Sequence, residues 1–352
     1  MQKQEVLFTH NIEEDLEKVL SRCAYDKLFL LTDESTLKFC VPIIRNFKCL
    51  KNASIITIPA GDLNKNLHSM QIVWNALDEM KASRRSLMIN LGGGMVTDLG
   101  GFAASTFKRG IPFVNIPTTL LAMVDASVGG KTGINFNGLK NEIGVFNIAE
   151  CVIIYSDFLK TLDIQNLLSG YAEMLKHGLI SNVKHWAELL NFDWNKPDYK
   201  ELLSLIEQSV LIKEKIVEKD PHEHGIRKAL NFGHTIGHAF ESWSMESNHP
   251  ILHGYAVAFG MVCELYFSYL RLKFPQDKLQ QTNLFIKEHY GTLGITCKQY
   301  DKLYELITHD KKNTDGVINF TLLSDIGDIH INQQADKKEI FEVFDFFQDA
   351  GF

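Results

Sequence analysis

Short apolar runs alternate with amphipathic stretches along the first half of the chain, and this pattern predicts a mostly parallel sheet covered by helices. Several of the predicted strands end at glycine, threonine or aspartate residues. In open α/β sheets, ligands bind at the carboxyl ends of the strands. We therefore expect a cofactor site at this edge. The predicted strands are Lys27–Thr32, Ser54–Pro59, Ser86–Leu91, Phe113–Pro117 and Val152–Tyr155.

The pattern changes after about residue 160, where long helical stretches such as Tyr199–Lys219 and His253–Phe274 replace the strands. A last strand-like run, Val317–Leu323, predicts a small hairpin near the end of the chain. The sequence thus predicts an α/β domain over residues 1–160 followed by a helical domain over residues 161–352. We expect an active site in the cleft between the two domains.

Composition and charge narrow the class of protein. The 352 residues are 45% hydrophobic and 22% charged, as in globular proteins. With 36 Lys and Arg against 43 Asp and Glu, a nucleic-acid partner held by a general positive field is not expected. The six scattered cysteines form no Cys-x-x-Cys pair, which indicates reduced thiols. Apolar runs far shorter than about 18 residues and an acidic N-terminus predict a cytoplasmic protein without membrane spans.

Two glycine-rich segments follow predicted strands. Gly92-Gly93-Gly94 lies between a strand and a helix, where glycines let the backbone approach a pyrophosphate. Because the Gly-x-Gly-x-x-Gly fingerprint is absent, a nucleotide site and a plain strand-to-helix turn both stay open. Gly129-Gly130-Lys131-Thr132 lacks the P-loop spacing. It suits either a small phosphate or a solvated surface turn.

Histidine and glutamate residues form the sharpest candidate site. His234 and His238 are four residues apart, so both rings lie on one helical face at metal-ligand spacing. A Zn²⁺ site would draw on this pair together with Glu173 and His253. Thr235 stands where a zincin protease needs glutamate. The pair alone could equally pack or cap a helix, and spacing does not say which histidine would be the non-ligand.

Cationic residues accompany these motifs in the sequence. Lys176, Lys213, Arg227 and the pair Lys311-Lys312 lie near the glycine and histidine motifs along the chain. Isolated lysines on helices are usually solvated. As a group, however, they predict a substrate with two anionic groups.

Five segments in one order carry a resemblance to a known family: Gly92–Asn141, Ala172–Lys176, Gly225–His238, Leu252–Gly254 and Asp310–Lys312. The chain resembles the 3-dehydroquinate synthases of the sugar-phosphate cyclase superfamily over nearly its whole length. The resemblance implies a Rossmann-like NAD-binding domain, a helical metal- and substrate-binding domain, and a homodimer. It also implies NAD and Zn²⁺ as cofactors, with Co²⁺ as a possible substitute.

The resemblance also assigns roles to residues. The metal ligands would be Glu173, His234 and His253, which makes His238 the non-ligand and a candidate proton relay. The cofactor-binding residues would be Asp33, Lys65, Gly93, Gly94, Asp98, Thr118, Thr119, Lys131, Lys140, Phe158 and Thr161. The substrate would be bound by Arg109 from the neighbouring subunit and by Asn141, Lys176, Lys213, Arg227, Asn231, Lys311 and Lys312. The catalytic set would be His238, Lys131, Lys176, Asp125 and Glu223.

The implied reaction converts 3-deoxy-D-arabino-heptulosonate 7-phosphate to 3-dehydroquinate and phosphate. It combines transient oxidation by NAD, elimination of phosphate, reduction and an intramolecular aldol step. The alternative is another sugar-phosphate cyclase, such as 2-deoxy-scyllo-inosose synthase, whose substrate lacks the carboxylate. A metal-dependent polyol dehydrogenase and a non-catalytic sugar-phosphate sensor are further rivals.

The sequence departs from the family pattern at three places. The segment Thr161–Asn166 lacks the usual Pro, Arg and Glu, Asp62 replaces a glutamate, and Pro221-His222 replaces a Glu-Arg pair. The first two lie near the expected cofactor edge, so they bear on contacts to the adenosine half of NAD.

Overall fold

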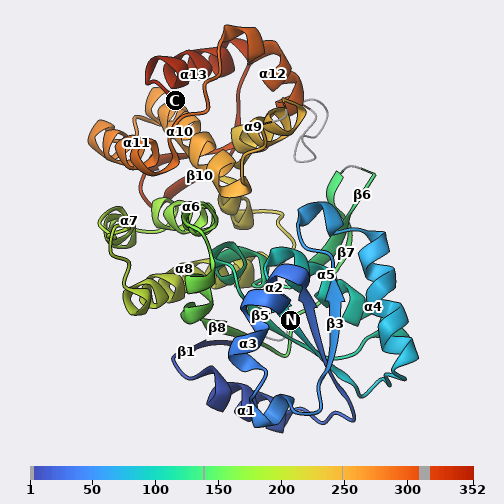
Figure 1. The fold of residues 1–352 in the computed structure, drawn as a ribbon. Coiled ribbons are helices and arrows are strands. Elements are labelled where there is room, and N and C mark those ends of the chain that lie inside the picture. The colour runs from blue at the N-terminus through green and yellow to red at the C-terminus, as the bar shows by residue number, and fades with distance from the viewer. Residues whose placement is uncertain (1–3, 138, 248, 309–317) are drawn as a thin grey trace. The chain divides into compact units, whose positions relative to one another are not determined.

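The computed structural model describes residues 4–137, 139–247, 249–308 and 318–352. Its contacts divide the chain into two compact units (Figure 1). The first unit contains Met1–Asp163 and Asp198–Val210, and the second contains Ile164–Pro197 and Leu211–Phe352. Residues 198–210 thus group with the first unit although they follow residues of the second in sequence.

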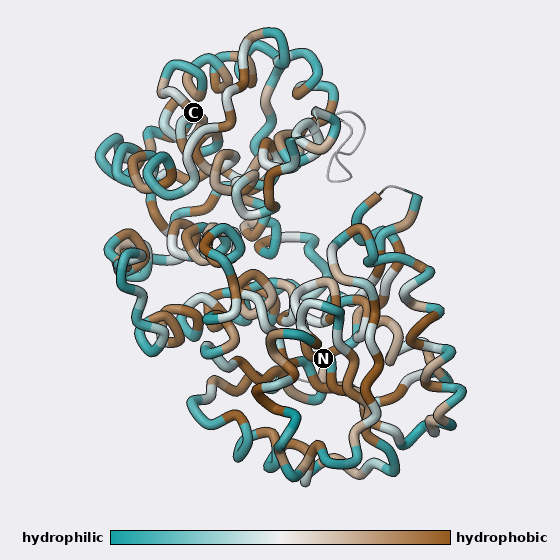
Figure 2. The backbone as a smooth tube through the Cα atoms, in the orientation of Figure 1, coloured by the Kyte–Doolittle hydropathy of each residue, from teal (hydrophilic) through white to brown (hydrophobic). Residues whose placement is uncertain are grey.

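A six-stranded parallel sheet forms the core of the first unit. The strand order is β1-β8-β5-β4-β2-β3, and each neighbouring pair is parallel. These strands are largely brown, and so hydrophobic, in Figure 2, as expected for a sheet covered on both faces. The strands are β1 (Val6–Thr9), β2 (Leu28–Asp33), β3 (Ser54–Ile58), β4 (Leu87–Gly92), β5 (Phe113–Pro117) and β8 (Cys151–Tyr155).

This sheet confirms the predicted α/β fold and adds an edge strand that the sequence pattern did not indicate. Strand β1 has only four residues, too few for a clear alternation, and it is held by its parallel pairing with β8. The chain order reverses between β2 and β4, since β3 lies on one side of β2 and β4 on the other. Such a reversal marks the usual ligand crevice of an open α/β sheet.

Helices connect the strands of the first unit. Several begin at an asparagine or aspartate that accepts a backbone N–H, as for Asn11, Asp33 and Asn66. The helices are α1 (Ile12–Arg22), α2 (Glu34–Phe39), α3 (Val41–Ile44), α4 (Leu67–Glu79) and α5 (Gly94–Thr106), with shorter turns η3 (Phe107–Arg109), η4 (Ala122–Ala126) and η5 (Ser156–Thr161).

A separate antiparallel hairpin, β6 (Lys131–Phe136) and β7 (Leu139–Phe146), packs against α5. The sequence pattern suggests a glycine-rich turn for its first residues and does not indicate these strands. Gly133 and Gly144 face each other across the hairpin, and a Cβ on Gly144 would lie 2.0 Å from the Thr132 carbonyl oxygen. The glycines that suggest a loop therefore serve close strand packing.

The second unit is mostly helical. Its helices are α6 (Ile164–Leu179), α7 (Val183–Leu190), the C-terminal part of α8 (Tyr199–Lys219), α9 (His234–Glu246), α10 (His253–Leu272), α11 (Gln276–Tyr290), α12 (Tyr300–Thr308) and α13 (Lys337–Asp349), with the turn η6 (Ile226–Asn231). Strands β9 (Asn319–Asp325) and β10 (Asp328–Gln334) form the hairpin predicted near the end of the chain.

Helix α10 is the centre of the second unit and contacts α6, α9, α11, α13 and β9. Its residues 256–265 are all buried, as expected for a helix that is apolar all round. Within the part of the chain that the structure describes, every helix is too short or too polar to cross a membrane.

Candidate active site

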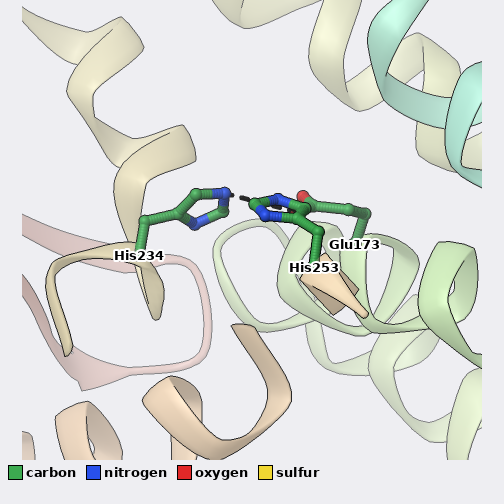
Figure 3. Close-up of side chains that lie close together, drawn as sticks. All are labelled: Glu173, His234 and His253. Carbon is green, nitrogen blue, oxygen red and sulfur yellow. Dashed lines mark ion pairs between the residues drawn. The ribbon is translucent and has the colours of Figure 1, made fainter. Parts of the chain in front are cut away.

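Glu173, His234 and His253 converge from three helices of the second unit (Figure 3). The Nε2 atoms of His234 and His253 lie 3.3 and 3.5 Å from Oε1 of Glu173. Oε2 of the same carboxylate pairs with the Lys176 ammonium. All three candidate metal ligands are therefore in one place, with their ligand atoms within 4.8 Å of one another.

Close helix packing brings these residues together. His253 is the first residue of α10, and the neighbouring Gly254 donates its N–H to Oγ of Ser169, one turn before Glu173 on α6. A Cβ on Gly254 would lie 1.8 Å from the Ser169 carbonyl oxygen. Gly233, which precedes His234, has a φ of +77°, a conformation that favours glycine. Both histidines thus depend on an adjacent glycine.

The electrostatics of the cluster favour positive charge. Burial of Glu173 raises its pKa, but Lys176, His234 and His253 outweigh this and lower the pKa well below the usual value. Burial lowers the pKa of His253, yet hydrogen bonds with Glu173 and Glu241 raise it to about 10. Glu173 and Glu241 therefore stabilise a positive charge at His253, which an added proton on the ring can supply.

The donor set fits a divalent metal ion. A fully buried carboxylate is costly without a cationic partner, and two imidazoles turn their Nε2 atoms toward it. Two histidines and one glutamate are a known ligand set for catalytic Zn²⁺, with open positions left for substrate. His238 lies beside this set, with its ring centroid 5.3 Å from that of His234 and 5.9 Å from that of His253.

Two buried cationic side chains and a half-buried amide occur in the same unit. Lys213 and Arg227 are 6% and 3% exposed. Asn231 donates a 2.8 Å hydrogen bond to Glu223, and both residues line a cavity of about 190 Å³ together with Lys228. Polar side chains that line a cavity are available to a ligand.

The loop that carries Arg227 is organised by Asp220. Its carboxylate accepts N–H bonds from His224, Gly225 and Arg227 at 2.6 to 3.0 Å. Arg227 also donates to the Pro221 carbonyl oxygen at 2.5 Å. Asp220 therefore fixes this loop through the backbone.

Several predicted cofactor residues gather in the first unit. Lys65 is buried, and its ammonium lies 2.5 Å from both Asp98 Oδ2 and Asn141 Oδ1. Gly93 and Gly94 form the turn from β4 into α5, at the carboxyl edge of the sheet. This edge combines the N-terminus of α5 with the charged side chains of Lys65 and Asp98, and phosphate groups bind at helix N-termini.

Asp33 and the two threonines lie at the ends of neighbouring strands. Asp33 ends β2 and accepts the Thr36 N–H at 2.7 Å as the cap of α2. Thr118 follows β5 and donates its N–H to the Gly92 carbonyl at 2.9 Å. Thr119 accepts the Ala122 N–H at 3.2 Å. These residues therefore lie at the carboxyl ends of β2 and β5, the two strands that flank β4 in the sheet.

The remaining predicted residues of the first unit are spread over several elements. Lys131, Arg109 and Asn141 are exposed, and Lys140 is 3.4 Å from Asp62. Asp125 is half-buried in the turn η4. Phe158 is fully buried. Thr161 donates to the Phe158 carbonyl at 2.7 Å. The predicted residues Lys311 and Lys312 lie outside the described residues.

Sequence reasoning missed two buried carboxylates next to the histidines. Glu241 lies 3.1 Å from Nδ1 of His253. Glu264 accepts N–H bonds from Gly233, Thr235 and Ile236 at the start of α9. A lone acid within the apolar stretch 256–265 is a signal for Glu264, because such a residue needs a buried partner.

Comparisons with known proteins identify the family of this chain. The family model described as "3-dehydroquinate synthase N-terminal" matches residues 55–169, and the model described as "3-dehydroquinate synthase C-terminal" matches residues 170–313. The chain is 55% identical over 350 residues to the 3-dehydroquinate synthase of Parabacteroides distasonis, covering 99% of both chains.

Solved structures share the fold. One is a 2-epi-5-epi-valiolone synthase of Streptomyces hygroscopicus with NAD⁺ and Zn²⁺ bound, which is 23% identical with a TM-score of 0.87 over 99% of this chain and 98% of that one. Another is a 2-deoxy-scyllo-inosose synthase complexed with carbaglucose-6-phosphate, NAD⁺ and Co²⁺, at 22% identity and a TM-score of 0.81 over 96% and 95% of the two chains. At these identities the likeness concerns the fold. The matches to both family models and to the P. distasonis enzyme show that the chain belongs to the 3-dehydroquinate synthase family.

Proposed function

We propose that the chain is a lyase that converts 3-deoxy-D-arabino-heptulosonate 7-phosphate to 3-dehydroquinate and phosphate, the second step of the shikimate pathway. The observation that carries this proposal is the buried Glu173, faced by two imidazole Nε2 atoms and by Lys176. It occurs in a chain that is 55% identical to a 3-dehydroquinate synthase over nearly its whole length.

In this proposal the two domains have different tasks. Residues 1–160 bind NAD⁺, and residues 161–352 bind the metal ion and the substrate. When bound, a divalent metal such as Zn²⁺ supplies Lewis-acid chemistry and NAD⁺ supplies a reversible hydride acceptor. Glu173, His234 and His253 hold the metal.

The chain's own residues bind and orient the cofactor. Gly93 and Gly94 present the N-terminus of α5 to the pyrophosphate of NAD⁺, and Lys65 adds positive charge while Asp98 holds its ammonium in place. The other residues proposed to contact NAD⁺ are Asp33, Thr118, Thr119, Lys131, Lys140, Phe158 and Thr161.

Cationic residues bind the two anionic ends of the substrate. Lys213, Arg227 and Asn231 hold the carboxylate. Both cationic side chains are buried, and a buried cation is stabilised by an anionic partner, which favours this substrate over those of sister cyclases that lack the carboxylate. Lys131, Asn141, Lys176 and one of Lys311 and Lys312 surround the phosphate, while Asp125 and Glu223 orient the catalytic groups.

His238 moves a proton in this proposal. It lies within ring contact of both metal-binding histidines without being needed as a ligand. A neutral imidazole accepts a proton from a substrate hydroxyl near pH 7 and returns it later.

The active form in this proposal is a homodimer in which Arg109 reaches the phosphate of the partner's site. The β6–β7 hairpin exposes large apolar side chains, including Phe136, Leu139 and Phe146, as interaction surfaces do. Asn147, just after β7, donates to Ser105 at 2.8 Å, close in sequence to Arg109 on η3. The apolar hairpin and Arg109 thus belong to neighbouring parts of one surface.

Substrate choice tests the proposed activity against its rivals. Purified protein with Zn²⁺ and NAD⁺ is given either 3-deoxy-D-arabino-heptulosonate 7-phosphate or sedoheptulose 7-phosphate, and the products are identified by mass spectrometry. We expect 3-dehydroquinate from the first sugar and no cyclised product from the second. Turnover of sedoheptulose 7-phosphate alone would assign the chain to a sister cyclase activity instead.

A further inference from the structure

Glu241 contacts one of the proposed metal ligands from the side away from Glu173. Its Oε2 lies 3.1 Å from Nδ1 of His253, whereas Nε2 of the same ring lies 3.5 Å from Oε1 of Glu173. Both carboxylates are buried, with exposures of 6% and 0%. The His253 ring is therefore held between two carboxylates, one on each nitrogen.

Imidazole chemistry gives these two contacts different roles. In a neutral imidazole one nitrogen carries the proton and the other carries the lone pair. If a metal ion takes the place of the Nε2 proton, Nδ1 keeps its proton and donates it to Glu241, and the lone pair of Nε2 is left for the ion next to Glu173. A carboxylate behind a histidine in this way fixes its tautomer and raises its basicity as a metal ligand.

We propose that Glu241 is a positioning residue for the metal site, which orients His253 and keeps its Nε2 available to the ion. This inference rests on the proposed role of Glu173, His234 and His253 as metal ligands. It adds a residue that contacts the ligand and not the metal.

The second histidine shows why His253 needs such support. Nδ1 of His234 lies 3.1 Å from the Phe232 carbonyl oxygen, so the backbone orients that ring. The backbone is in turn held by Glu264, which accepts the N–H groups of Gly233 and Thr235. His253 is the more exposed ring, with 27% of its side chain accessible against 11% for His234. Its orientation depends on a side chain that mutation can remove.

The packing of α9 against α10 places Glu241 next to Nδ1 of His253. Glu241 lies seven residues after His234, which is two turns along the same face of α9. Between them, Gly237 lets the helices approach closely, since a Cβ there would lie 2.9 Å from the Ala256 carbonyl oxygen. A carboxylate as buried as Glu241 needs a charged or hydrogen-bonding partner. His253 provides it.

Zinc affinity of the metal-free protein tests the proposal without using activity. The dissociation constant is measured by competition with a chromophoric chelator for wild type, Glu241→Ala, Glu241→Gln and Glu246→Ala. Glu246 lies on the same helix but is exposed. Glu246→Ala is therefore the control, because it removes the same negative charge without removing a buried contact. The d–d absorption of the Co²⁺-loaded proteins reports the ligand geometry, and far-UV circular dichroism checks the fold.

We expect Glu241→Ala to weaken zinc binding by roughly 10- to 100-fold and to alter the Co²⁺ spectrum. Glu241→Gln keeps an acceptor oxygen and nearly the same volume, so we expect a folded protein with a smaller loss. Glu246→Ala should bind zinc like the wild type.

Three results would overturn the inference. They are zinc binding by Glu241→Ala within about twofold of wild type, an equal loss in Glu246→Ala, and a complete loss in Glu241→Ala like that of a ligand variant. If Glu241→Ala does not fold, Glu241→Gln decides: an unchanged zinc affinity together with an unchanged Co²⁺ spectrum would reject the positioning role. A different result would reject the proposed metal site itself, namely an unchanged zinc affinity in Glu173→Ala.

Discussion

Glu173 has no exposed surface, yet it remains ionised because three cationic or cation-binding groups surround it. A charge in such a place costs several kcal/mol unless it is paired. The cost is offset by Lys176 and by the two imidazoles, which also make the site attractive to a metal ion. At the scale of single residues, the chemistry of this protein thus depends on how each buried charge is partnered.

Two variants distinguish a loss of metal binding from a loss of proton transfer. We expect Glu173→Ala to lose bound zinc and turnover together, because it removes a ligand. His238→Asn should keep stoichiometric zinc while kcat falls by about 10²-fold or more, as for other general acid–base residues. Zinc content by atomic absorption and steady-state kinetics measure both effects. Loss of zinc in His238→Asn would show that the ligand set includes this residue.

His185 on α7 predicts a pH dependence of stability that is separate from the metal site. Burial lowers the pKa of this side chain from 6.5 to about 4, with Glu188 opposing the shift. The folded state therefore binds fewer protons than the unfolded state between these pH values. Its stabilising contribution is present above pH 6.5 and is lost as the pH falls toward 4, by up to about 3 kcal/mol.

Urea unfolding of wild type and His185→Gln at several pH values measures this contribution. We expect the free energy of unfolding to fall more steeply with decreasing pH in the wild type. Parallel pH profiles in the two proteins would contradict the assignment to His185.

The helices of the second unit owe their close packing to glycines. Gly254 lies against the backbone of α6, and Gly260 on α10 lies against the start of α9, where a Cβ would be 2.0 Å from the Gly233 carbonyl oxygen. These contacts hold His253 and His234 in register with Glu173. At the scale of elements, the proposed metal site therefore depends on how α6, α9 and α10 pack against one another.

Gly254→Ala tests this link between packing and site. The added methyl group would clash with the Ser169 carbonyl oxygen and displace the first turn of α10 from α6. Such small-to-large changes in a packed core destabilise a protein by about 1 to 3 kcal/mol. We expect a lower melting temperature and weaker zinc binding in the same variant. Ser242→Ala, at an exposed position of α9, is the control. An unchanged zinc affinity with reduced stability would show that the site tolerates movement of α10.

The sequence predicts the parts of this molecule that depend on local pattern. All five predicted strands of the first half match β2, β3, β4, β5 and β8 to within one residue at each end. The His234 and His238 spacing correctly indicated that both rings lie near one place. The i, i+4 spacing places His234 and His238 on one helical face but does not show which of them would bind a metal. The assignment of His253 as a ligand and His238 as a non-ligand therefore depends on the family resemblance.

Other features depend on contacts between distant segments, so the sequence pattern did not indicate them. Strand β1 exists through its pairing with β8, and the β6–β7 hairpin consists of residues that look like a glycine-rich turn. Glu241 and Glu264 became candidates only when the fold placed them beside His253 and the start of α9.

At the scale of the whole molecule, the hairpin predicts how two copies associate. Phe146 is 56% exposed on β7, and Phe146→Glu would place a charge in the proposed interface. We expect this variant to shift from dimer to monomer in sedimentation velocity and to lose activity through Arg109. Leu284→Glu alters an exposed leucine on α11 and should leave the oligomeric state unchanged. A dimeric Phe146→Glu protein would place the interface elsewhere.

Phosphate release with a trace of NAD⁺ tests the proposed activity most directly. The zinc-loaded protein is supplied with excess 3-deoxy-D-arabino-heptulosonate 7-phosphate and substoichiometric NAD⁺, while phosphate and the absorbance of NADH are followed together. We expect one phosphate and one 3-dehydroquinate per substrate molecule, many turnovers per NAD⁺, and no lasting NADH. Accumulation of NADH in proportion to substrate consumed, without phosphate release, would contradict it and indicate a dehydrogenase.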